Sequence, residues 1–413
     1  MDFEIPAEIR AKLAELDAFI EREIEPLEVE NPQFFDHRRE HARTDWDNGG
    51  RPRREWEELL REMRRRADAA GHYRYALPKR LGGQDGTNLA MAIIREHLAA
   101  KGLGLHNDLQ NEASIVGNFP LVLMMDAFGS PAQKERFLDG MITGEVRMGF
   151  GLTEPEHGSD ATWLETTAVR DGDGWRIQGK KRFNSGLHSA THDLVFARTS
   201  GKPGQARGIS GFVVPTDAEG FSVDFMWWTF NMPSDHAEVT LADVWVPDEA
   251  LLHEEGRGLE LAQVFVHENR IRQAASSVGA ARYCIGEAVR YANRRVTWGK
   301  KLSSNQGIQF PLAELHTECE MVRNLVYKTA WELDRRHHLQ VTDRVAMANY
   351  RANRLVCEAA DRAIQVHGGI GYTRHLPFEH IYRHHRRYRI TEGSEEIQIR
   401  KVAGHLFGYL GRE

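Results

Sequence analysis

The sequence predicts an α+β protein with three parts in chain order: an N-terminal all-α domain (1–148), a central antiparallel β domain (149–250) and a C-terminal four-helix bundle (251–413). Three observations predict this. Apolar residues recur at helical spacing through the first part, and the period changes to two in the second. After about Gly258 the helical period returns and runs almost to the end. No helix of useful length interrupts the strand-like runs, so we expect an antiparallel sheet and not a doubly wound one.

The first helix of the N-terminal part is marked by one apolar stripe. It consists of Ile9, Leu13, Leu16, Ile20 and Ile24, which share one face of a helix.

A later helix in this part has recognisable ends. Ser130 can cap it, Pro131 suits its first turn and Gly140 can end it. Between the two helices, residues 31–53 form a charge-dense insertion with a Gly49-Gly50 pair. We expect this insertion to be a solvated loop and not a module.

The β domain is predicted from a hairpin and several short runs. The hairpin spans Val169 to Ile177, with Asp171-Gly172-Asp173-Gly174 as its turn and with Trp175 and Ile177 on one face. Further strand-like runs are Leu194–Ala197, Gly211–Val214 and Val239–Leu241, the last continuing through Val244–Val246 to a terminating Pro247.

The C-terminal bundle is predicted from four helical segments. They lie near residues 259–293, 305–336, 341–367 and 391–409, which fits a four-helix bundle. We find no internal repeat and no low-complexity tract.

Bulk properties exclude several classes of protein. A chain of 413 residues is longer than one core usually supports, and a net charge of −6 disfavours a dedicated nucleic-acid binder. Three cysteines without metal-ligand spacing predict reduced thiols, no disulfide framework and no metal site: Cys284, Cys319 and Cys357. The N-terminus lacks the order of a secretory signal, and no apolar run approaches the ~20 residues of a membrane helix. We therefore expect no membrane association and a cytosolic setting, in bacteria the cytosol and in a eukaryote the mitochondrial matrix.

Two segments of the β domain could contact a ligand. Phe150–Asp160 combines glycines, which permit close approach of backbone, with the hydroxyls of Thr153 and Ser159. By composition alone a surface turn is the favoured explanation of this stretch. Phe183 and Ser185 are two residues apart at a strand end, so alternation places them on one face. An ordinary strand-end aromatic is the alternative there.

Two helix ends in the C-terminal part offer further candidate contacts. Arg295, in Arg295–Gly299, could bind a pyrophosphate through two parallel N–H groups or could simply answer the helix dipole. Gln365–Tyr372 ends a helix with three glycines in four positions, more than a bare C-cap needs, and its exposed amides could bind phosphate. His367, within that segment, is assigned no role.

These segments together resemble the acyl-CoA dehydrogenase family over nearly the whole chain. The matching motifs are Leu152-Thr153-Glu154-Pro155 with Gly158-Ser159-Asp160, Arg295–Gly299, Gln365–Tyr372 and Thr391–Ile397. The resemblance implies the fold of that family, a bound FAD and a homo-oligomer, either a dimer or a tetramer. It implies FAD-binding roles for Phe150, Leu152, Thr153, Ser159, Phe183, Ser185, Arg295, Trp298, Gln306, Gln365, Gly368, Gly369 and Ser394. It implies substrate-binding roles for Ser159, Arg270 and Gly393. Phe183 replaces the family's usual tryptophan, and Trp298 replaces its usual phenylalanine.

Glu392 is the candidate catalytic residue. Dehydrogenation between Cα and Cβ of a thioester needs a base for the Cα proton and an acceptor for the hydride from Cβ, which no side chain can be. A carboxylate buried beside an acyl chain has the raised pKa that such a base needs. By the resemblance, Glu392 matches the family's base and Gly393 lets substrate approach the backbone. The alternative is a capping glutamate on a solvated helix, as we expect for Glu395 and Glu396.

A second position for the base is also open. A minority of the family carries its base at the position that matches Asn269, and asparagine cannot abstract a proton. The adjacent Glu268 is therefore the second candidate.

The resemblance implies α,β-dehydrogenation of an acyl-CoA to the trans-2-enoyl-CoA, as in fatty acid β-oxidation, with electrons passed to an electron-transfer flavoprotein. Two alternatives remain: an acyl-CoA oxidase that uses oxygen, and a non-catalytic flavin protein that binds nucleic acid through the basic run Arg383–Arg389. Many relatives have Arg-Asp within this run, so a local salt bridge is missing here. A solvated helix face balanced by nearby acids is the first interpretation of the run.

Overall fold

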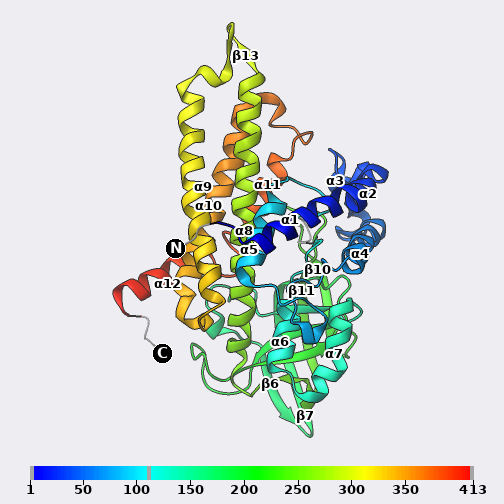
Figure 1. Cartoon of the computed structure of the whole chain (residues 1–413). Helices are drawn as coiled ribbons and strands as arrows, with labels where there is room; N and C mark the ends of the chain where they lie inside the picture. The colour runs from blue at the N-terminus through cyan, green and yellow to red at the C-terminus, as the bar shows by residue number, and fades with distance from the viewer. Residues whose placement is uncertain (1–3, 109–112, 410–413) are drawn as a thin grey trace. The chain divides into compact units, whose positions relative to one another are not determined.

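The computed structural model describes residues 4–108 and 113–409, apart from the side chains of Asp108 and Glu268. By its contacts the chain forms two compact units. Unit 1 comprises Met1–Arg43, Arg54–Asn118 and Asn269–Glu413, and unit 2 comprises Thr44–Arg53 and Phe119–Glu268. Figure 1 shows the elements of both units coloured along the chain. The predicted α+β class with helical, sheet and helical parts is confirmed, whereas the three-domain boundaries stay a prediction.

Unit 1 is helical. Its N-terminal helices are α1 (Ala7–Phe19), α2 (Glu25–Glu30), α3 (Arg39–Arg43), α4 (Arg54–Ala69) and α5 (Asn88–Ala99), with a π-helical turn at Ile20–Ile24. Its C-terminal helices are α8 (Gly258–Arg294, within unit 1 from Asn269), α9 (Gln306–Leu333), α10 (Thr342–His367), α11 (Phe378–Arg387) and α12 (Glu395–Phe407). Short strand pairs are β3 (Asn107–Asp108) with β4 (Ala113–Ser114) and β13 (Val296–Thr297) with β14 (Lys300–Lys301).

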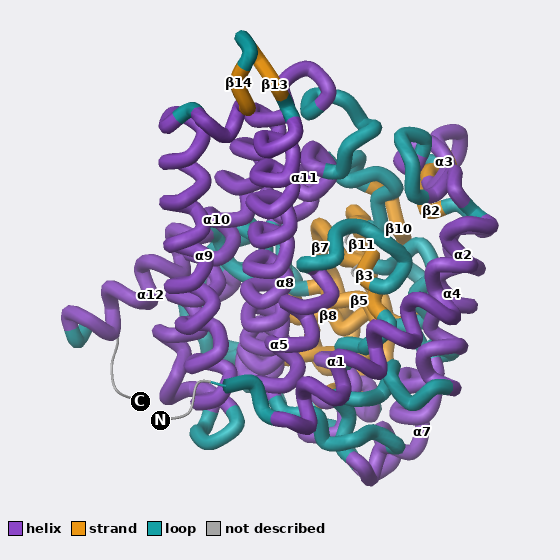
Figure 2. Tube along the Cα trace, turned by 45° about the horizontal axis from the view of Figure 1, so that its top comes forward, coloured by secondary structure: helices purple, strands orange, loops and turns teal. Residues whose placement is uncertain are grey.

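Small residues let the long helices of unit 1 pack closely. Ala274, Ala281 and Ala288 face the core from α8, and Ala352 and Ala359 face it from α10. α8, α9 and α10 accordingly lie side by side in Figures 1 and 2. Such close packing excludes water from the interior, which is the main stabilising term of a bundle.

One glycine shows how close these helices come. A Cβ on Gly279 of α8 would lie 2.2 Å from the carbonyl oxygen of Glu96 on α5. The C-terminal helices therefore pack against an N-terminal helix as well as against one another.

One sequence prediction for unit 1 needs correction. The basic run before Glu392 was interpreted as a solvated helix face; it forms the helix α11, but that helix packs against α10. The helical pattern was obscured because its buried face carries histidines, His380, His384 and His385, in place of aliphatic residues.

Unit 2 is built around an eight-stranded sheet in the order β10-β11-β7-β6-β8-β9-β12, with β5 beside β8. Its strands are β5 (Met148–Gly151), β6 (Thr167–Asp171), β7 (Gly174–Ser185), β8 (His192–Arg198), β9 (Ile209–Pro215), β10 (Phe221–Met226), β11 (His236–Pro247) and β12 (Leu251–Leu252). Two helices, α6 (Pro120–Phe128) and α7 (Pro131–Thr143), and the pair β1 (Thr44–Asp45) with β2 (Arg51–Pro52) complete it.

The predicted hairpin is confirmed. β6 pairs with β7 in antiparallel register up to Asp171 opposite Gly174, and Trp175 and Ile177 are both buried. The sheet is antiparallel except that β5 runs parallel to β8 and β6 meets β8 at one parallel pair. The β6–β7 hairpin is long enough to carry the chain from β5 back to a parallel β8.

One further expectation for unit 2 is corrected. Ser130 forms a capping box with Gln133 and Pro131 begins α7, as predicted, but Gly144 and not Gly140 ends the helix, in the left-handed conformation with φ 83°. Gly140 lies inside the helix, where a Cβ would meet Val146 at 2.6 Å, so a glycine is needed there for packing.

The segment 31–53 is ordered and not a solvated loop. Phe34 is buried, and Arg39 and Arg43 on α3 are nearly so. β1 and β2, which follow α3, belong to unit 2, where the Ser234 amide donates to the Gly50 carbonyl oxygen at 2.9 Å. The prediction missed that two of its arginines, Arg39 and Arg43, are buried, with Arg39 paired with Glu379 at 2.9 Å.

The described residues also bear on the predictions about cysteines, metal sites and membrane helices. The three cysteines are free buried thiols, and burial raises the pKa of Cys357 to about 11. Within the described ranges, no three His, Cys, Asp or Glu side chains are grouped to hold a metal ion. Among the described helices, none combines the length and the apolar character needed to cross a membrane.

Candidate functional site

Glu392 lies in a tight loop between α11 and α12 of unit 1. Its backbone is left-handed, with φ 56°, and that of Gly393 has φ 86°. The guanidinium of Arg270 on α8 donates to the Glu392 carbonyl oxygen from Nε at 2.9 Å and from Nη2 at 2.5 Å. The side-chain amide of Asn269 donates to Glu392 Oε1 at 3.4 Å. The loop is therefore held at both its carbonyl and its carboxylate, and the half-buried carboxylate is oriented by α8.

Arg270 is a charged side chain that is buried away from solvent. Its side chain is buried, and burial lowers its pKa to about 10 although Glu392 opposes the shift. A Cβ on Gly393 would lie 2.9 Å from Arg270 Nη2. Gly393 is required here both by its positive φ and by the approach of this guanidinium. Arg270, predicted as a substrate contact, thus contacts the backbone of the base.

Glu395 and Glu396 differ from the predicted solvated glutamates in one respect. Both lie in the first turn of α12, and Glu396 is exposed. Glu395 is buried between Arg389, with bonds of 2.8 and 2.9 Å, and Arg354, with bonds of 3.2 Å. The bond to Arg389 lowers the pKa of Glu395 to about 2, so this carboxylate anchors the loop and is no base.

The second candidate base, Glu268, has a side chain outside the described part of the structure. Its neighbour Asn269 is nearly fully buried, and its Oδ1 accepts from Arg272 at 2.9 Å. Asn269, predicted to be inert as a base, is therefore a contact of Glu392.

The predicted flavin stretch of unit 2 follows β5 directly. Leu152 and Thr153 are half-buried, and Ser159 is exposed. The Thr153 carbonyl accepts from the Arg182 amide of β7 at 2.8 Å. Phe150 stacks on Phe265 with ring centroids 4.2 Å apart. The stretch is thus fixed along the end of β7, where its hydroxyls remain accessible.

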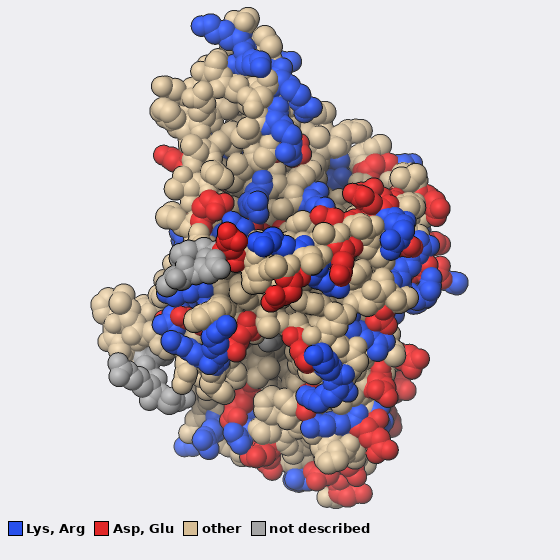
Figure 3. All heavy atoms as spheres, viewed as in Figure 1, with Lys and Arg blue, Asp and Glu red and all other residues tan. Residues whose placement is uncertain are grey.

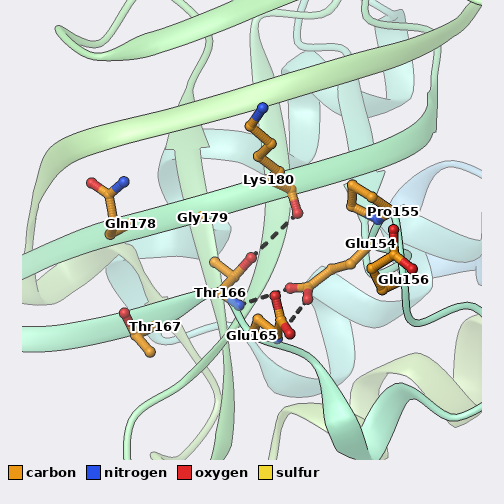
Figure 4. A pocket seen from close by; sticks show the side chains of 9 residues that line it. All are labelled: Glu154, Pro155, Glu156, Glu165, Thr166, Thr167, Gln178, Gly179 and Lys180. Atoms are coloured by element: carbon orange, nitrogen blue, oxygen red, sulfur yellow. Dashed lines mark hydrogen bonds between the residues drawn. The ribbon is translucent and has the colours of Figure 1, made fainter.

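A buried ion pair lies beneath this stretch. Lys181 Nζ is 2.8 Å from Glu154 Oε1, and both side chains are almost completely buried. Glu154 also accepts from the backbone amides of Glu165 at 2.5 Å and Thr166 at 2.9 Å, as Figure 4 shows. Glu154 is therefore a structural anchor of the stretch. Burial is the largest influence on its pKa, yet Lys181 and these amides together lower that pKa.

The same ion pair borders a shallow hollow of unit 2. The hollow has a volume of about 380 Å³ and contains none of the predicted site residues in its lining. It is lined by Glu154, Pro155, Glu156, Glu165, Thr166, Thr167, Gln178, Gly179 and Lys180 (Figure 4). Because Glu154 is engaged by Lys181 and two amides, we do not place the chemistry here.

A β-bulge presents Phe183 and Ser185. β11 pairs with Asn184 and with Arg182 but skips Phe183, whose φ is 64°. Both Phe183 and Ser185 are exposed while Asn184 is buried, so the predicted shared face is confirmed. The exposed ring and hydroxyl fit a flat cofactor, and a bulge that re-aims side chains is typical of functional sites.

Asn184 pairs with a buried acid. Its Nδ2 donates to Asp193 Oδ2 at 2.5 Å, and burial raises the pKa of Asp193 to about 7. Cβ atoms on Gly149 and Gly151 would lie 2.6 and 2.7 Å from this pair. The glycines of β5 are explained by this contact, and sequence reasoning missed Asp193 because it lies within an apolar strand.

The predicted contacts for the adenine half of FAD lie at two helix ends of unit 1. Trp298 and Gly299 form the turn between β13 and β14, and the Trp298 side chain is 99 % exposed with φ 46°. Arg295 and Gln306, which flank this hairpin, are also exposed. A tryptophan in a left-handed turn, fully exposed, is unfavourable unless it has a partner.

The end of α10 lies beside the end of α8. Tyr291 and His367 have ring centroids 4.3 Å apart, and His367 packs as expected without a role. Gly368, with φ 65°, and Gly369 are exposed with open space at their Cβ positions, and Gln365 is exposed. A bare glycine backbone and nearby basic side chains, seen around β13 and β14 in Figure 3, form a donor set that fits the phosphates of FAD.

Three family profiles cover nearly the whole chain. "Acyl-CoA dehydrogenase, N-terminal domain" matches residues 6–145, the middle domain 149–244 and the C-terminal domain 256–407. The chain belongs to the acyl-CoA dehydrogenase family. It is an FAD-dependent oxidoreductase.

Relatives and solved structures agree with this assignment. The chain is 34 % identical over 335 residues to acyl-CoA dehydrogenase FadE12 of Mycobacterium tuberculosis, covering 80 % of this chain and 84 % of that protein. It is 32 % identical over 337 residues to the caffeyl-CoA reductase-Etf complex subunit CarC of Acetobacterium woodii, covering 81 % and 87 %. The structure of butyryl-CoA dehydrogenase from Megasphaera elsdenii is 28 % identical, with a TM-score of 0.78 over 98 % of this chain and 100 % of that one.

Proposed function

We propose that the protein is an acyl-CoA dehydrogenase that converts an acyl-CoA thioester to the trans-2-enoyl-CoA. The observation that supports this best is the carboxylate of Glu392, which is oriented by Asn269 on a loop whose carbonyl Arg270 grips. A carboxylate fixed in this way can remove a proton without first reorganising its surroundings.

Around the active carboxylate, Glu392 accepts the substrate proton and its neighbours hold it in position. Glu392 takes the Cα proton of the thioester onto its carboxylate. Arg270 holds the backbone and so keeps the carboxylate oriented, and the missing Cβ of Gly393 lets that guanidinium approach. By the family resemblance, Gly393 also lets the substrate approach the backbone. Bound FAD supplies the acceptor for the hydride that leaves Cβ. By the family resemblance, Thr153, Ser159, Phe183 and Ser185 would hold the flavin ring. Ser394 has a role in binding FAD by the same resemblance.

The positions of the predicted FAD contacts support a homo-oligomer. Arg270 and Arg294 lie on one helix, 24 residues apart, which is about 36 Å of helix. Arg270 contacts the Glu392 loop from the N-terminal half of α8, whereas Arg295, Gln306 and Gln365 lie near its C-terminal end. An extended FAD is shorter than that, so we propose that Arg295, Trp298, Gln306, Gln365, Gly368 and Gly369 serve the cofactor of a second copy. Whether the assembly is a dimer or a tetramer does not alter this argument.

The onward acceptor is proposed to be an electron-transfer flavoprotein. One relative is named as a subunit of an Etf complex, and a solved structure that matches at 28 % identity and TM-score 0.79 is described as an electron transferring flavoprotein. An oxidase that uses oxygen remains the alternative for the acceptor.

Reduction of an aryl acrylate is a second candidate for the direction of the reaction. Two relatives at 32 % identity are named caffeyl-CoA reductase subunit and 3-(aryl)acrylate reductase. The same carboxylate would then deliver the proton to Cα, because the two directions share one transition state. The acceptor and its potential decide which direction prevails.

The basic run on α11 does not favour a nucleic-acid-binding role. Arg383 lies 3.0 Å from Glu40 and 2.7 Å from Glu379, and Arg389 pairs with Glu395. His384 and His385 are completely buried. The acids expected to balance the run are present, but the helix is packed and not a solvated face.

A panel of acyl-CoA thioesters tests the function. Anaerobic addition of the right thioester to the FAD-loaded protein should bleach the flavin absorbance, and admission of air should restore it quickly only in an oxidase. Glu392→Gln should slow bleaching by at least about 100-fold, since a positioned base contributes about 10²–10⁴. A variant that bleaches at the parent rate would remove Glu392 from the role of base.

A further inference from the structure

A buried chain of side-chain hydrogen bonds runs through unit 1 towards the Glu392 loop. Its members are fully buried: Ser277 on α8, Asn349 and Asn353 on α10, and His385 on α11. Sequence analysis singled out none of Ser277, Asn349 and Asn353, and it treated His385 only as part of the basic run Arg383–Arg389. Full burial of four polar side chains in an alanine-rich core is costly unless every bond is made.

The bonds of Asn353 connect the chain to the loop. Asn353 Nδ2 donates to the Tyr388 carbonyl oxygen at 3.0 Å and to Asn349 Oδ1 at 3.0 Å. Ser277 Oγ donates to Asn353 Oδ1 at 2.8 Å. Asn353 therefore uses both of its protons and its oxygen, and one of those protons fixes the backbone four residues before Glu392.

The bonds of Asn349 connect the chain to Arg270. Asn349 Nδ2 donates to the Arg270 carbonyl oxygen at 2.8 Å and to Gln273 Oε1 at 3.3 Å. The guanidinium of Arg270 in turn donates two hydrogen bonds to the carbonyl oxygen of Glu392. The two asparagines thus support the loop from two sides, through Tyr388 and through Arg270.

The direction of the bonds also fixes the protonation of His385. Ser277 has one hydroxyl proton, and Asn353 Oδ1 can only accept it. The contact of 3.0 Å between His385 Nδ1 and Ser277 Oγ must then be donated by His385, which carries its proton on Nδ1. The chain runs head to tail from His385 through Ser277 to the asparagines, and reversing one amide would break it.

We propose that Asn353 and Asn349 are positioning residues for the catalytic base, acting through Tyr388 and Arg270 to hold the Glu392 loop in its left-handed conformation. This inference rests on the proposed role of Glu392. It predicts that weakening the chain slows proton removal without weakening the binding of the thioester, because neither asparagine lines the carboxylate itself.

The test uses near-isosteric variants of the FAD-loaded enzyme. Asn353→Leu and Asn349→Leu remove the bonds to the loop supports, and Ser277→Ala removes only the outer bond. Thr329→Val is the matched control, because Thr329 is equally buried on α9 but bonds only to Leu325 of its own helix. If the variants act only by removing a buried hydrogen bond from the helical core, all four should change kcat and hydrogen exchange to a similar extent.

Two measurements distinguish positioning from stability. Asn353→Leu and Asn349→Leu should lower kcat about tenfold with KM within about twofold, as expected for a displaced base, and deuterium at Cα should slow the variants more than the parent. Amide hydrogen exchange within residues 388–394 should be faster in these variants and in Ser277→Ala, but at the parent rate in Thr329→Val.

The outcomes separate this inference from the proposed function. If the asparagine variants and Ser277→Ala keep the parent kcat and exchange, or if Thr329→Val lowers kcat equally, the inference is wrong. If the leucine variants fail to fold, Ser277→Ala decides by amide hydrogen exchange within residues 388–394, where exchange at the parent rate would overturn the inference. If Glu392→Gln bleaches at the parent rate, the proposed base is wrong, while the exchange data still report whether the chain holds the loop.

Discussion

Glu392, the proposed base, has an unfavourable left-handed backbone conformation. A non-glycine residue at φ 56° costs on the order of 1 kcal/mol or more relative to the right-handed region. Two bonds from Arg270 to its carbonyl and one from Asn269 to its carboxylate hold it there. Strain that the surroundings over-determine is typical of a functional residue.

The nearness of Asn269 to Glu392 leads to a prediction of rescue. Asn269→Glu in the Glu392→Gln background should recover about tenfold or more of the lost activity, because the new carboxylate would stand within reach of the missing one. Flavin bleaching by the best thioester measures it. The single variant Asn269→Glu is the control and should shift the pH–rate profile, since adjacent carboxylates raise one pKa. A double variant no faster than Glu392→Gln would show that the two positions are not interchangeable.

For single residues, the sequence predicted the catalytic carboxylate but not the residues that hold it in position. Glu392 and Gly393 could be found because they stand in a recognisable motif. Asn349 and Asn353 could not, because residues four apart on one helical face have the spacing of ordinary core positions. Arg270 was expected near the substrate, and only the coordinates show its guanidinium on the Glu392 carbonyl.

β7 and its neighbours show what a strand pattern can and cannot tell. Alternation predicted that Phe183 and Ser185 share a face, and they do. It could not predict that β11 skips Phe183, because a bulge depends on pairing with a strand more than 50 residues away along the chain. A helix end is equally hard to predict: Gly140 was expected to end α7, but it is a packing glycine against Val146, and Gly144 ends the helix with a positive φ.

Asp193 makes unit 2 sensitive to pH. Burial raises its pKa from 3.8 to about 7, so the folded state prefers the protonated acid. Its contribution to stability is complete below about pH 3.8 and is lost as pH rises through 7. Asp193→Asn keeps an acceptor for Asn184 and has no charge, so the variant should melt a few degrees higher than the parent at pH 8, by roughly 2 °C or more.

Thermal unfolding at two pH values checks this prediction. The advantage of Asp193→Asn at pH 8 should shrink or vanish at pH 4. Asp139→Asn, which alters an exposed carboxylate on α7, is the control for a general effect of charge removal. An equal difference at both pH values would mean that Asp193 is ionised throughout.

For the whole molecule, the exposed Trp298 turn argues for assembly. Trp298→Ser should weaken association and FAD retention by about 2 kcal/mol, or roughly 30-fold, because exposed tryptophans at protein interfaces are frequent hot spots. Sedimentation velocity would measure the assembly, and the ratio of flavin to protein absorbance would measure the cofactor. Trp163→Ser, at a half-exposed tryptophan of unit 2, is the control. A Trp298→Ser protein that stays assembled and saturated with FAD would contradict the shared site.

The order of helical, sheet and helical parts could be predicted from the sequence, because the spacing of apolar residues depends only on neighbouring positions in the chain. The grouping of the chain into units was not, because it depends on contacts such as those of Gly279 on α8 with Glu96 on α5, nearly half the chain apart. The role of the insertion 31–53 was misjudged for the same reason. Its arginines look solvated until their partners are known, as with Arg39 and Glu379 at 2.9 Å.

The threading of the chain between the two units sets an order for synthesis. Unit 2 needs nothing beyond Glu268, whereas unit 1 must wait for the segment that starts at Asn269. As the polypeptide leaves the ribosome, the sheet can close first, and the early helices α1, α4 and α5 remain without their later partners until α8 to α10 emerge. Those early helices are therefore the part of the nascent protein that most needs a chaperone.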